Sequence, residues 1–300
     1  MGINRQTFQL MLLENQFKEL AGDFLCIGKQ TVNVELNDIV QLMEDHQLDT
    51  SKVKSLISDE KFDSATRHGN QSLYDHDLLS ALSPNLNYHC LDRSDYEGAD
   101  IIQDMNEPLS AELVGKFDAI YNGSCMDNIF NPVSFLQNTT HLLKPGGRII
   151  HIECASSVAG AYLMYSPEWF FSYYSINEFR DCKVYVTVAR DASDSVYKFK
   201  TDLYEWKPDF TRGGAYNYID ACKSINGLMH VIVVAEKGEN STANKSPIQM
   251  QYLDENAVDW RVNYQKFVQS ARPKLKAPIQ KEQARLPLDS DHFIYLGSDF

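Results

Sequence analysis

Residues 116–153, KFDAIYNGSCMDNIFNPVSFLQNTTHLLKPGGRIIHIE, contain the pattern that decides the fold of this chain. The segment 117–121 is short and mostly apolar, which suits a buried parallel strand. Pro132 suits the first turn of a helix, because its missing N–H would have no partner there in any case. A second buried strand is expected to begin at Ile149. Strand, helix and strand in this order predict a right-handed parallel crossover.

The helix predicted between these two strands has one apolar face and a clear end. We expect its apolar face to consist of Val133, Phe135, Leu136, Leu142 and Leu143. Lys144 is expected in the last turn, where the carbonyl end of a helix favours a cation. The Pro-Gly-Gly sequence at 145–147 should then stop the helix.

The order FDAIYN, helix, LLKPGGRIIHIE resembles the fourth strand, the following helix and the fifth strand of class I S-adenosylmethionine-dependent methyltransferases. In that family the turn into the fifth strand commonly reads Leu-Lys-Pro-Gly-Gly, as residues 143–147 do here. The resemblance covers residues 23–235 and is firmest over 86–153. It implies an α/β fold with a doubly wound, mostly parallel, seven-stranded Rossmann-like sheet. The cofactor S-adenosyl-L-methionine would then lie across the carboxyl ends of the strands.

The sequence also predicts how the chain is divided. We expect an N-terminal helical extension at 1–22, a catalytic domain at 23–236 with insertions at about 47–86 and 190–226, and a C-terminal extension at 237–300. A helix over 7–20 would cover the flank of the domain or bind a partner. The C-terminal extension carries many large apolar side chains, and its basic residues gather over 261–285. We expect it to pack on the domain or on a neighbouring subunit of a homo-oligomer, with a phosphate-bearing substrate as the alternative for its cations.

Composition narrows the classes of function. The chain has 28 Lys and Arg against 41 Asp and Glu, which gives a net charge of −13. Such an acidic chain is a poor partner for nucleic acid or for an anionic membrane. It contains no apolar run of about 18 residues, and its first ten residues do not resemble a signal peptide. None of the six cysteines forms a C-x-x-C pair, so we expect no zinc site and a cytoplasmic protein with reduced thiols.

The first predicted strand, residues 23–28, ends at Gly28. In the resembled family this strand leads into a glycine-rich loop whose small residues let backbone N–H groups approach the cofactor. Here Gly28 is followed by Lys29, Gln30 and Thr31, which departs from the usual G-x-G pattern. We expect Gly28 to contact the cofactor, either alone or with another segment that completes the pocket.

The second predicted strand, residues 86–91, is followed directly by Asp92. A carboxylate at this point can accept hydrogen bonds from both ribose hydroxyls of a nucleoside cofactor. The insertion at 47–86 explains why Asp92 lies farther from Gly28 than the usual interval. The simpler role for Asp92 is to form the turn at the end of the strand, and Asp95 is the second candidate for the ribose.

Three further residues are expected at the cofactor. The resemblance places Asp104, after a third strand predicted over 98–105, near the exocyclic amine of the adenine, and the N–H of Met105 near the adenine ring. A helix-capping role for Asp104 or Asn106 is an equal alternative. Asn122, at the end of the fourth strand, would lie where the methionine part of the cofactor meets the substrate.

The implied reaction is transfer of a sulfonium methyl group to a nucleophile, which needs in-line alignment and, for a hydroxyl, a base. His151 and Glu153 are base candidates near the end of the fifth strand, and alternation places both on one side of it. A buried scaffold role is equally compatible with their positions. Asp127, just past the fourth strand, is a third candidate. Tyr162 and Tyr165 precede a predicted helix and are expected to contact the substrate.

The substrate class follows mainly from exclusions. The motif of amino-methylating enzymes and a basic surface for nucleic acid are both missing, so we expect a small molecule or a soluble glycan precursor, methylated at oxygen. A site that combines His68, Asp75 and His76 matches no known metal signature, so no metal is expected. Two alternatives stay open: a non-catalytic binding or scaffold protein with a degenerate cofactor loop, and a nicotinamide-dependent oxidoreductase, against which the missing G-x-G-x-x-G argues.

Overall fold

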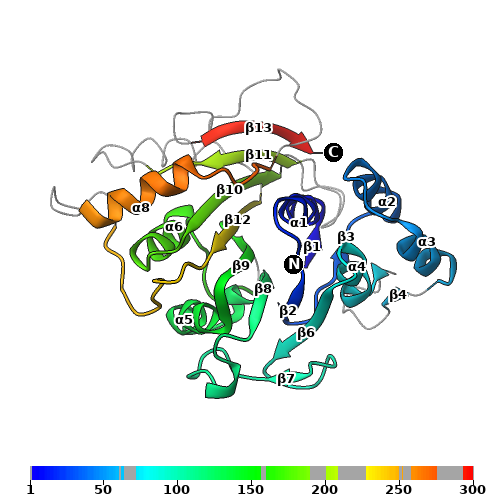
Figure 1. The fold of residues 1–300 in the computed structure, drawn as a ribbon, viewed down its shortest axis with the longest axis horizontal. Helices are drawn as coiled ribbons and strands as arrows, with labels where there is room; N and C mark the ends of the chain where they lie inside the picture. Colours follow the sequence, from blue (N-terminus) through cyan, green and yellow to red (C-terminus); the bar gives the residue numbers. More distant parts are fainter. Residues whose placement is uncertain are drawn as a thin grey trace. The chain divides into compact units, whose positions relative to one another are not determined.

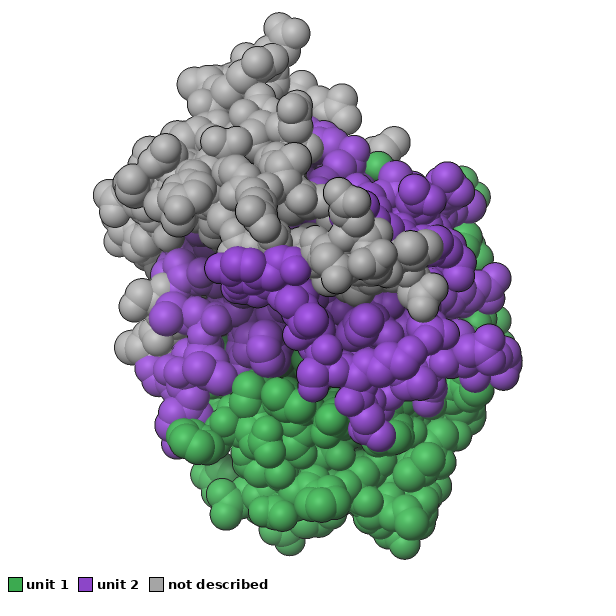
Figure 2. Space-filling model, turned by 90° about the vertical axis from the view of Figure 1, so that its left-hand side faces the viewer, with its two compact units in different colours: residues 1–149, 272–275 green, residues 150–271, 276–300 purple. Residues whose placement is uncertain are grey.

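The structure is a computed structural model that describes most of the chain. It covers residues 2–60, 62–63, 72–156, 160–189, 201–208, 228–249, 252, 258–275 and 293–299, of which 62–63, 72, 258–260 and 298–299 are described by backbone alone. The chain forms two compact units, which Figure 2 colours separately. The first consists of residues 1–149 with 272–275, and the second of residues 150–271 with 276–300.

The first unit contains five α-helices among its described residues. These are α1 (Arg5–Phe17), α2 (Leu36–Asp45), α3 (Ser51–Ser58), α4 (Asp75–Leu82) and α5 (Pro132–Leu142). Its strands are β1 (Ile3–Asn4), β2 (Gly22–Ile27), β3 (Val32–Asn33), β4 (Phe62–Asp63), β5 (Ser72–Leu73), β6 (Leu86–Asp92), β7 (Ile101–Ile102), β8 (Phe117–Gly123) and the first part of β9 (Leu143–Cys154). Two short 3₁₀ turns cover Ala111–Leu113 and Met126–Asn128.

The strands of the first unit follow the order β9-β8-β2-β6-β7 (Figure 1). β2 is parallel to both β6 and β8, and β6 is parallel to β7. In the register, Ile27 pairs with Leu91 on one side and with Asn122 on the other. The carboxyl ends of β2, β6 and β8 therefore meet at one edge of the sheet, where crossover connections leave room for a ligand.

The second unit contains the rest of β9 together with β10 (Asp181–Ala189), β11 (Thr201–Trp206), β12 (Met229–Glu236) and β13 (Phe293–Asp299). β10 is antiparallel to both β12 and β11, and β11 is antiparallel to β13. α6 (Pro167–Ile176) and α8 (Val258–Gln269) pack on β10 (Figure 1). Among their contacts, the ring of Phe171 meets the rings of Trp206, Tyr264 and Phe267 edge to face.

The α/β class and the mostly parallel sheet expected from the sequence are confirmed. The last strand of the expected set, β12, does lie antiparallel beside the sixth, β10. The sheet has more than the seven expected strands, because β11 and β13 add two antiparallel strands after β10. β11 comes from the insertion expected at 190–226, most of which lies outside the described residues. β13 comes from the C-terminal extension and forms an edge strand.

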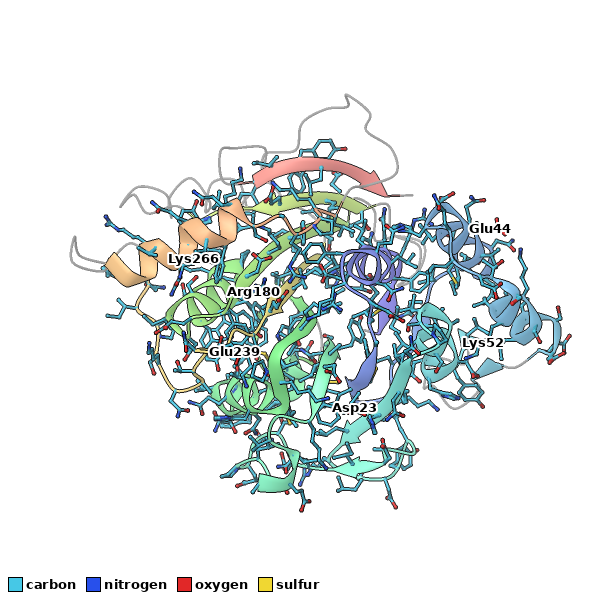
Figure 3. All side chains as sticks on the ribbon, viewed as in Figure 1. Asp23, Glu44, Lys52, Arg180, Glu239 and Lys266 are labelled. Carbon is cyan, nitrogen blue, oxygen red and sulfur yellow. The ribbon has the colours of Figure 1, made fainter. Side chains whose placement is uncertain are left out.

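The end of α5 differs from the prediction. The helix ends at Leu142, and the extended strand β9 begins at once with Leu143. Lys144 therefore lies in a strand, where its ammonium contacts Asp118 at 2.7 Å and Asp23 at 3.4 Å. Figure 3 labels Asp23 at the start of β2. This ion pair, and not the carbonyl end of the helix, satisfies the cation, and the hydrogen bond that Lys144 donates to Asp118 raises the pKa of Lys144. Val133, expected in the apolar stripe, is exposed instead.

Other helix boundaries also shift. α1 begins at Arg5 because Asn4 and Thr7 form a reciprocal capping box. The residue that precedes α2 is Glu35, and its side chain makes no capping hydrogen bond. The third strand is reduced to Ile101–Ile102. None of the described helices combines the length and the apolar character needed to cross a bilayer.

A buried charge cluster lies inside the first unit. The carboxylate of Glu14, on α1, accepts a hydrogen bond from Arg148 Nη1 at 3.0 Å and another from Arg272. All three side chains are almost fully buried. Arg148 also donates to the backbone carbonyls of Glu14, Lys18 and Glu19, so it closes the open end of α1. The two ion pairs to Glu14 and the backbone hydrogen bonds of Arg148 offset part of the cost of burying these charges.

Candidate functional site

The carboxyl end of β2 requires a glycine. Gly28 has a φ of +70°, in the left-handed region, and its N–H donates to the carbonyl of Leu91 at 2.7 Å. A Cβ at this position would lie 2.8 Å from Sγ of Cys125 and 3.8 Å from Oδ2 of Asp92. The backbone turn and the crowded space therefore both select glycine here. Gly28 itself is buried, and it lies beside the Asp92 carboxylate.

Asp92 is the last residue of β6 and keeps part of its side chain exposed. Its Oδ1 accepts from the N–H of Arg93 at 2.5 Å, and its Oδ2 is the oxygen nearest to Gly28. One oxygen thus holds the turn, and the other faces the strand-end edge. The two roles considered for Asp92, turn former and ribose acceptor, are compatible. Asp95, the second candidate, is exposed.

Asp104 and Met105 follow β7 in the next connection. Oδ1 of Asp104 accepts from both the backbone N–H and the side-chain amide of Asn106, each at 2.9 Å. These hydrogen bonds lower the pKa of Asp104, and Arg93 Nε lies 3.4 Å from its other oxygen. Met105 is buried, and its carbonyl accepts from Asn138. Asp104 therefore holds a local turn. No helix begins at residues 104–106, so the helix-capping alternative is wrong, and the adenine role stays a prediction.

Asn122 is the second-last residue of β8, and Asp127 lies in the connection after it; both are buried. Asn122 Oδ1 accepts from the N–H of Cys125 at 3.0 Å. Both oxygens of Asp127 accept hydrogen bonds, one from the hydroxyl of Ser124 at 2.5 Å and one from the amide of Asn128 at 2.7 Å. Ser124 itself has a φ of +69°. These contacts hold the connection in a compact shape at the edge that Gly28 and Asp92 share.

His151 and Glu153 lie in β9, within the second unit, and neither side chain is exposed. Nε2 of His151 is 2.6 Å from the hydroxyl of Tyr174, and its ring centroid is 5.1 Å from that of Phe170. Burial lowers the pKa of His151 to about 3, so the ring is neutral near pH 7. Every residue of this strand from Gly147 to Cys154 is buried, so both faces of the strand are covered there. Alternation alone therefore does not bring these two side chains to an open face.

The two tyrosines expected at the substrate are in different environments. Tyr162 is exposed, with 65% of its side-chain surface accessible. Tyr165 is only 4% exposed and packs against the rings of Trp169 and Phe170. Tyr162 is thus accessible from solution, whereas Tyr165 forms part of the packing around α6. Their role as substrate contacts stays a prediction.

Gln30 is the site residue whose role the sequence did not predict. It is buried, and its backbone N–H donates to Oδ2 of Asp75 at 2.7 Å. Its side-chain amide bends back to the carbonyl oxygens of Ile27 and Gly28, each at 2.8 Å. Asp75 also accepts from the hydroxyl of Tyr88, and burial raises the pKa of this carboxyl. The sequence feature that could have indicated this role is the departure from G-x-G at residue 30. A side chain as large as glutamine must be accommodated beside the strand end.

The described residues contain no cluster of three or more His, Cys, Asp or Glu side chains that could hold a metal. Asp75 and His76 begin α4, while His68 lies outside the residues that the structure describes. Of the expected cofactor residues, the sheet brings Gly28, Asp92 and Asn122 to one edge.

Comparisons with known proteins give distant likenesses only. No protein-family model and no curated protein matches the chain. A solved S-adenosylmethionine-dependent methyltransferase from Archaeoglobus fulgidus aligns with a TM-score of 0.39 and 10% identity over 77% of this chain and 94% of that one. The [4+2]-cyclase SpnF aligns with a TM-score of 0.34 and 13% identity over 78% and 80%.

The CMeT domain of the citrinin polyketide synthase aligns with a TM-score of 0.34 and 10% identity. The match covers 73% of this chain and 47% of that chain, so this chain spans about half the length of that protein. Likenesses at this level do not carry an assignment of function, which therefore rests on the residues of the chain itself.

Proposed function

We propose that this protein is an S-adenosylmethionine-dependent methyltransferase that acts on a small molecule or a soluble glycan precursor, at oxygen. The observation that carries the proposal is the pairing of Gly28 with Asp92. The left-handed glycine ends β2, and the carboxylate ends the adjacent parallel strand β6, with Oδ2 3.8 Å from the position of a Cβ on Gly28. Parallel sheets bind nucleotides at this kind of edge, where small residues admit the ligand and an acid accepts the ribose hydroxyls.

The residues at the edge fit the adenosine end of this cofactor. Oδ2 of Asp92 would accept from the ribose, and Gly28 would place no side chain between the backbone and the ligand. Asp104 or the N–H of Met105 would meet the adenine, although the Asn106 contacts of Asp104 would have to coexist with that role. The bound cofactor supplies an electrophilic methyl carbon for an incoming nucleophile.

A hydroxyl nucleophile must lose its proton to a base as the new bond forms. His151 is neutral near pH 7, but its Nε2 is engaged with the hydroxyl of Tyr174. Both oxygens of Asp127 accept hydrogen bonds, from Ser124 and from Asn128. Glu153 is the third candidate and is buried in β9. We keep all three as base candidates, and their order is to be decided by pH–rate profiles of single variants.

Calorimetric titration tests the proposal directly, with S-adenosylhomocysteine and NAD as the two ligands. We expect S-adenosylhomocysteine to bind and to raise the melting temperature, because a ligand that binds only the folded state stabilises it. Binding of NAD alone would support an oxidoreductase instead. Binding of neither ligand, in a protein shown to be folded by circular dichroism, would contradict the proposal.

Gln30 favours one alternative, a non-catalytic binding or scaffold protein. Its side chain occupies the strand end at which the resembled family has a glycine loop. A chain that has lost the cofactor would show no response to either nucleoside ligand. The titration above separates this alternative from the enzyme.

The proposal also places the protein in the cytoplasm and allows a homo-oligomer through residues 237–300. Within one chain, β13 already pairs with β11, which uses one edge of that strand for an internal contact. Sedimentation velocity of the full chain and of a chain truncated after Lys237 tests the oligomer. A mass that stays monomeric in both would remove it.

A further inference from the structure

The Gln30 side chain fills a specific position at the end of β2. Its Nε2 lies 2.8 Å from the carbonyl oxygens of both Ile27 and Gly28. The NH2 group is the donor end of an amide, so the nitrogen of Gln30 must face the two carbonyl oxygens. The side chain is 2% exposed, and it therefore belongs to the packed interior and does not sample solvent.

The neighbouring strand end is shaped around this amide. A Cβ at Gly123, the last residue of β8, would lie 1.8 Å from Oε1 of Gln30. Any side chain at residue 123 would thus expel the amide from its place. Cys125 lies on the other side, with its Sγ 2.8 Å from the carbonyl of Ile27 and 4.0 Å from Nε2 of Gln30. Gly28, Gly123 and Cys125 together form a small recess that Gln30 occupies.

The recess holds an amide whose hydrogen bonding is incomplete. Oε1 of Gln30 is buried and has no hydrogen-bond partner. A buried acceptor without a donor costs free energy, on the order of 1–3 kcal/mol. The two carbonyl oxygens accept from Nε2 of Gln30, but Oε1 of the same amide has no donor. A ligand group with N–H donors for the two carbonyls and no buried orphan oxygen would suit the recess better.

We infer that Gln30 determines cofactor affinity: its amide stands in for the amino group of the amino-acid end of the cofactor, which must displace it to bind fully. The inference rests on the proposed function. An ammonium group carries three N–H donors and would satisfy the carbonyls of Ile27 and Gly28 as the amide does now. The adenosine end, which meets Asp92, does not need Gln30 to move.

The test uses two ligands that differ in the amino-acid end. S-adenosylhomocysteine has it, and 5′-methylthioadenosine lacks it. In Gln30→Ala we expect S-adenosylhomocysteine to bind at least about 10-fold more tightly than in the wild type, the scale of one hydrogen bond that no longer has to be broken. The affinity for 5′-methylthioadenosine should stay within about 2-fold. The matched control is Gln41→Ala, which removes only an exposed contact with Asp45 and should change neither affinity.

A second variant guards against a loss of folding. Gln30→Met keeps most of the volume in the recess but cannot donate to the two carbonyls. It should bind S-adenosylhomocysteine more tightly than the wild type and less tightly than Gln30→Ala. Circular dichroism and thermal melting of each variant without ligand show whether the fold is kept.

The outcomes separate the inference from the proposed function. Equal affinities of folded Gln30→Ala, Gln30→Met and wild type for S-adenosylhomocysteine overturn the inference and leave the function standing. A weaker affinity in both variants also overturns it, because Gln30 would then be a ligand of the cofactor. Equal gains for both ligands would show that Gln30 restricts the whole pocket and not the amino-acid end. If no form binds either ligand, the proposed function fails and the inference falls with it.

Discussion

The sequence places candidate site residues in two polar regions of the molecule. One is at the ends of β2 and β6, and the other is in the interior of β9. In the structure they differ in exposure. Asp92 ends its strand, keeps part of its side chain exposed and directs one oxygen toward Gly28. His151 and Glu153 lie inside a strand that is covered on both faces, and neither is exposed.

The difference teaches that the position along a strand decides what a polar side chain can do. At a strand end the backbone turns away, so a carboxylate can stay exposed and exchange water for a ligand. In the interior of a strand, burial penalises charge, and the histidine is held neutral. Four substitutions test this contrast, and they follow in order of the expected effect.

The largest effect is expected from Gly28→Val. The new side chain would meet Sγ of Cys125 and stand beside Asp92, so binding of S-adenosylhomocysteine should weaken by at least about 100-fold. The left-handed φ adds strain of roughly 1–3 kcal/mol to the folded state. Gly98→Val is the matched control, because Gly98 also has a left-handed φ, +79°, but nothing lies within 4 Å of its Cβ position. Calorimetry on both variants measures the difference. Full affinity in a folded Gly28→Val protein would show that the cofactor lies elsewhere.

The second effect concerns the interior of β9 and appears in the pH dependence of stability. The pKa of His151 is about 3 in the folded state and near 6.5 in the unfolded chain, so between these values only the unfolded chain binds the proton. The free energy of unfolding therefore falls as the pH falls through this window, by about 2 kcal/mol from pH 7 to pH 5 for this group alone. His151→Gln keeps a polar partner for Tyr174 and should lose that much less stability over the same range. Urea unfolding of both proteins at the two pH values gives the comparison, and equal losses would mean that His151 is not held neutral.

The third effect returns to the strand ends. Asp92→Ala should weaken binding of S-adenosylhomocysteine by roughly 1–3 kcal/mol, the scale for lost hydrogen bonds to a charged acceptor. Asp95→Ala, three residues further along an exposed turn, should leave the affinity unchanged. If the two variants exchange these outcomes, the ribose role belongs to Asp95.

The smallest effect is expected at the opposite ends of the same strands. Lys144 bridges Asp118 and Asp23 near the starts of β8 and β2, at about one-third exposure. Lys144→Ala should lower the free energy of unfolding by at most about 1 kcal/mol, and less in high salt. It should not change the affinity for S-adenosylhomocysteine, since a charged cluster at the amino ends does not face the ligand edge. Lys52→Ala on α3 serves as the exposed control. A loss of affinity in Lys144→Ala would contradict the placement of the site.

Much of the fold could be predicted because the strands of the central sheet are short apolar segments with turn residues between them. The crossover from β8 through α5 to β9 follows from residues 117–149, since periodicity and proline placement are local properties. β11 and β13 could not be foreseen in the same way. They pair residues such as Tyr204 and Tyr295, far apart in the chain, and no local pattern specifies such a partner.

The candidate site could be predicted only in part. Gly28 and Asp92 were identified because the end of a strand can be recognised in sequence, and the sheet brings the two together. The position of the Gln30 side chain depends on the absence of a Cβ at Gly123, a residue 93 positions away (123 − 30) on another strand. Likewise, the neutral state of His151 depends on burial by Phe170 and Tyr174 from α6. Such properties arise from tertiary packing.

The cluster of Glu14, Arg148 and Arg272 has a consequence for the order of events during synthesis. Glu14 and Arg272 are 258 residues apart, yet both belong to the first compact unit. At 5–20 residues per second a ribosome needs roughly 15 to 50 s to pass from one to the other. Until Arg148 is made the carboxylate of Glu14 has neither arginine, and from then until Arg272 is made it has one of the two. The residues around Glu14 therefore stay incompletely paired until a segment made 258 residues later joins them, and a factor that shields the carboxylate would have to act within that time.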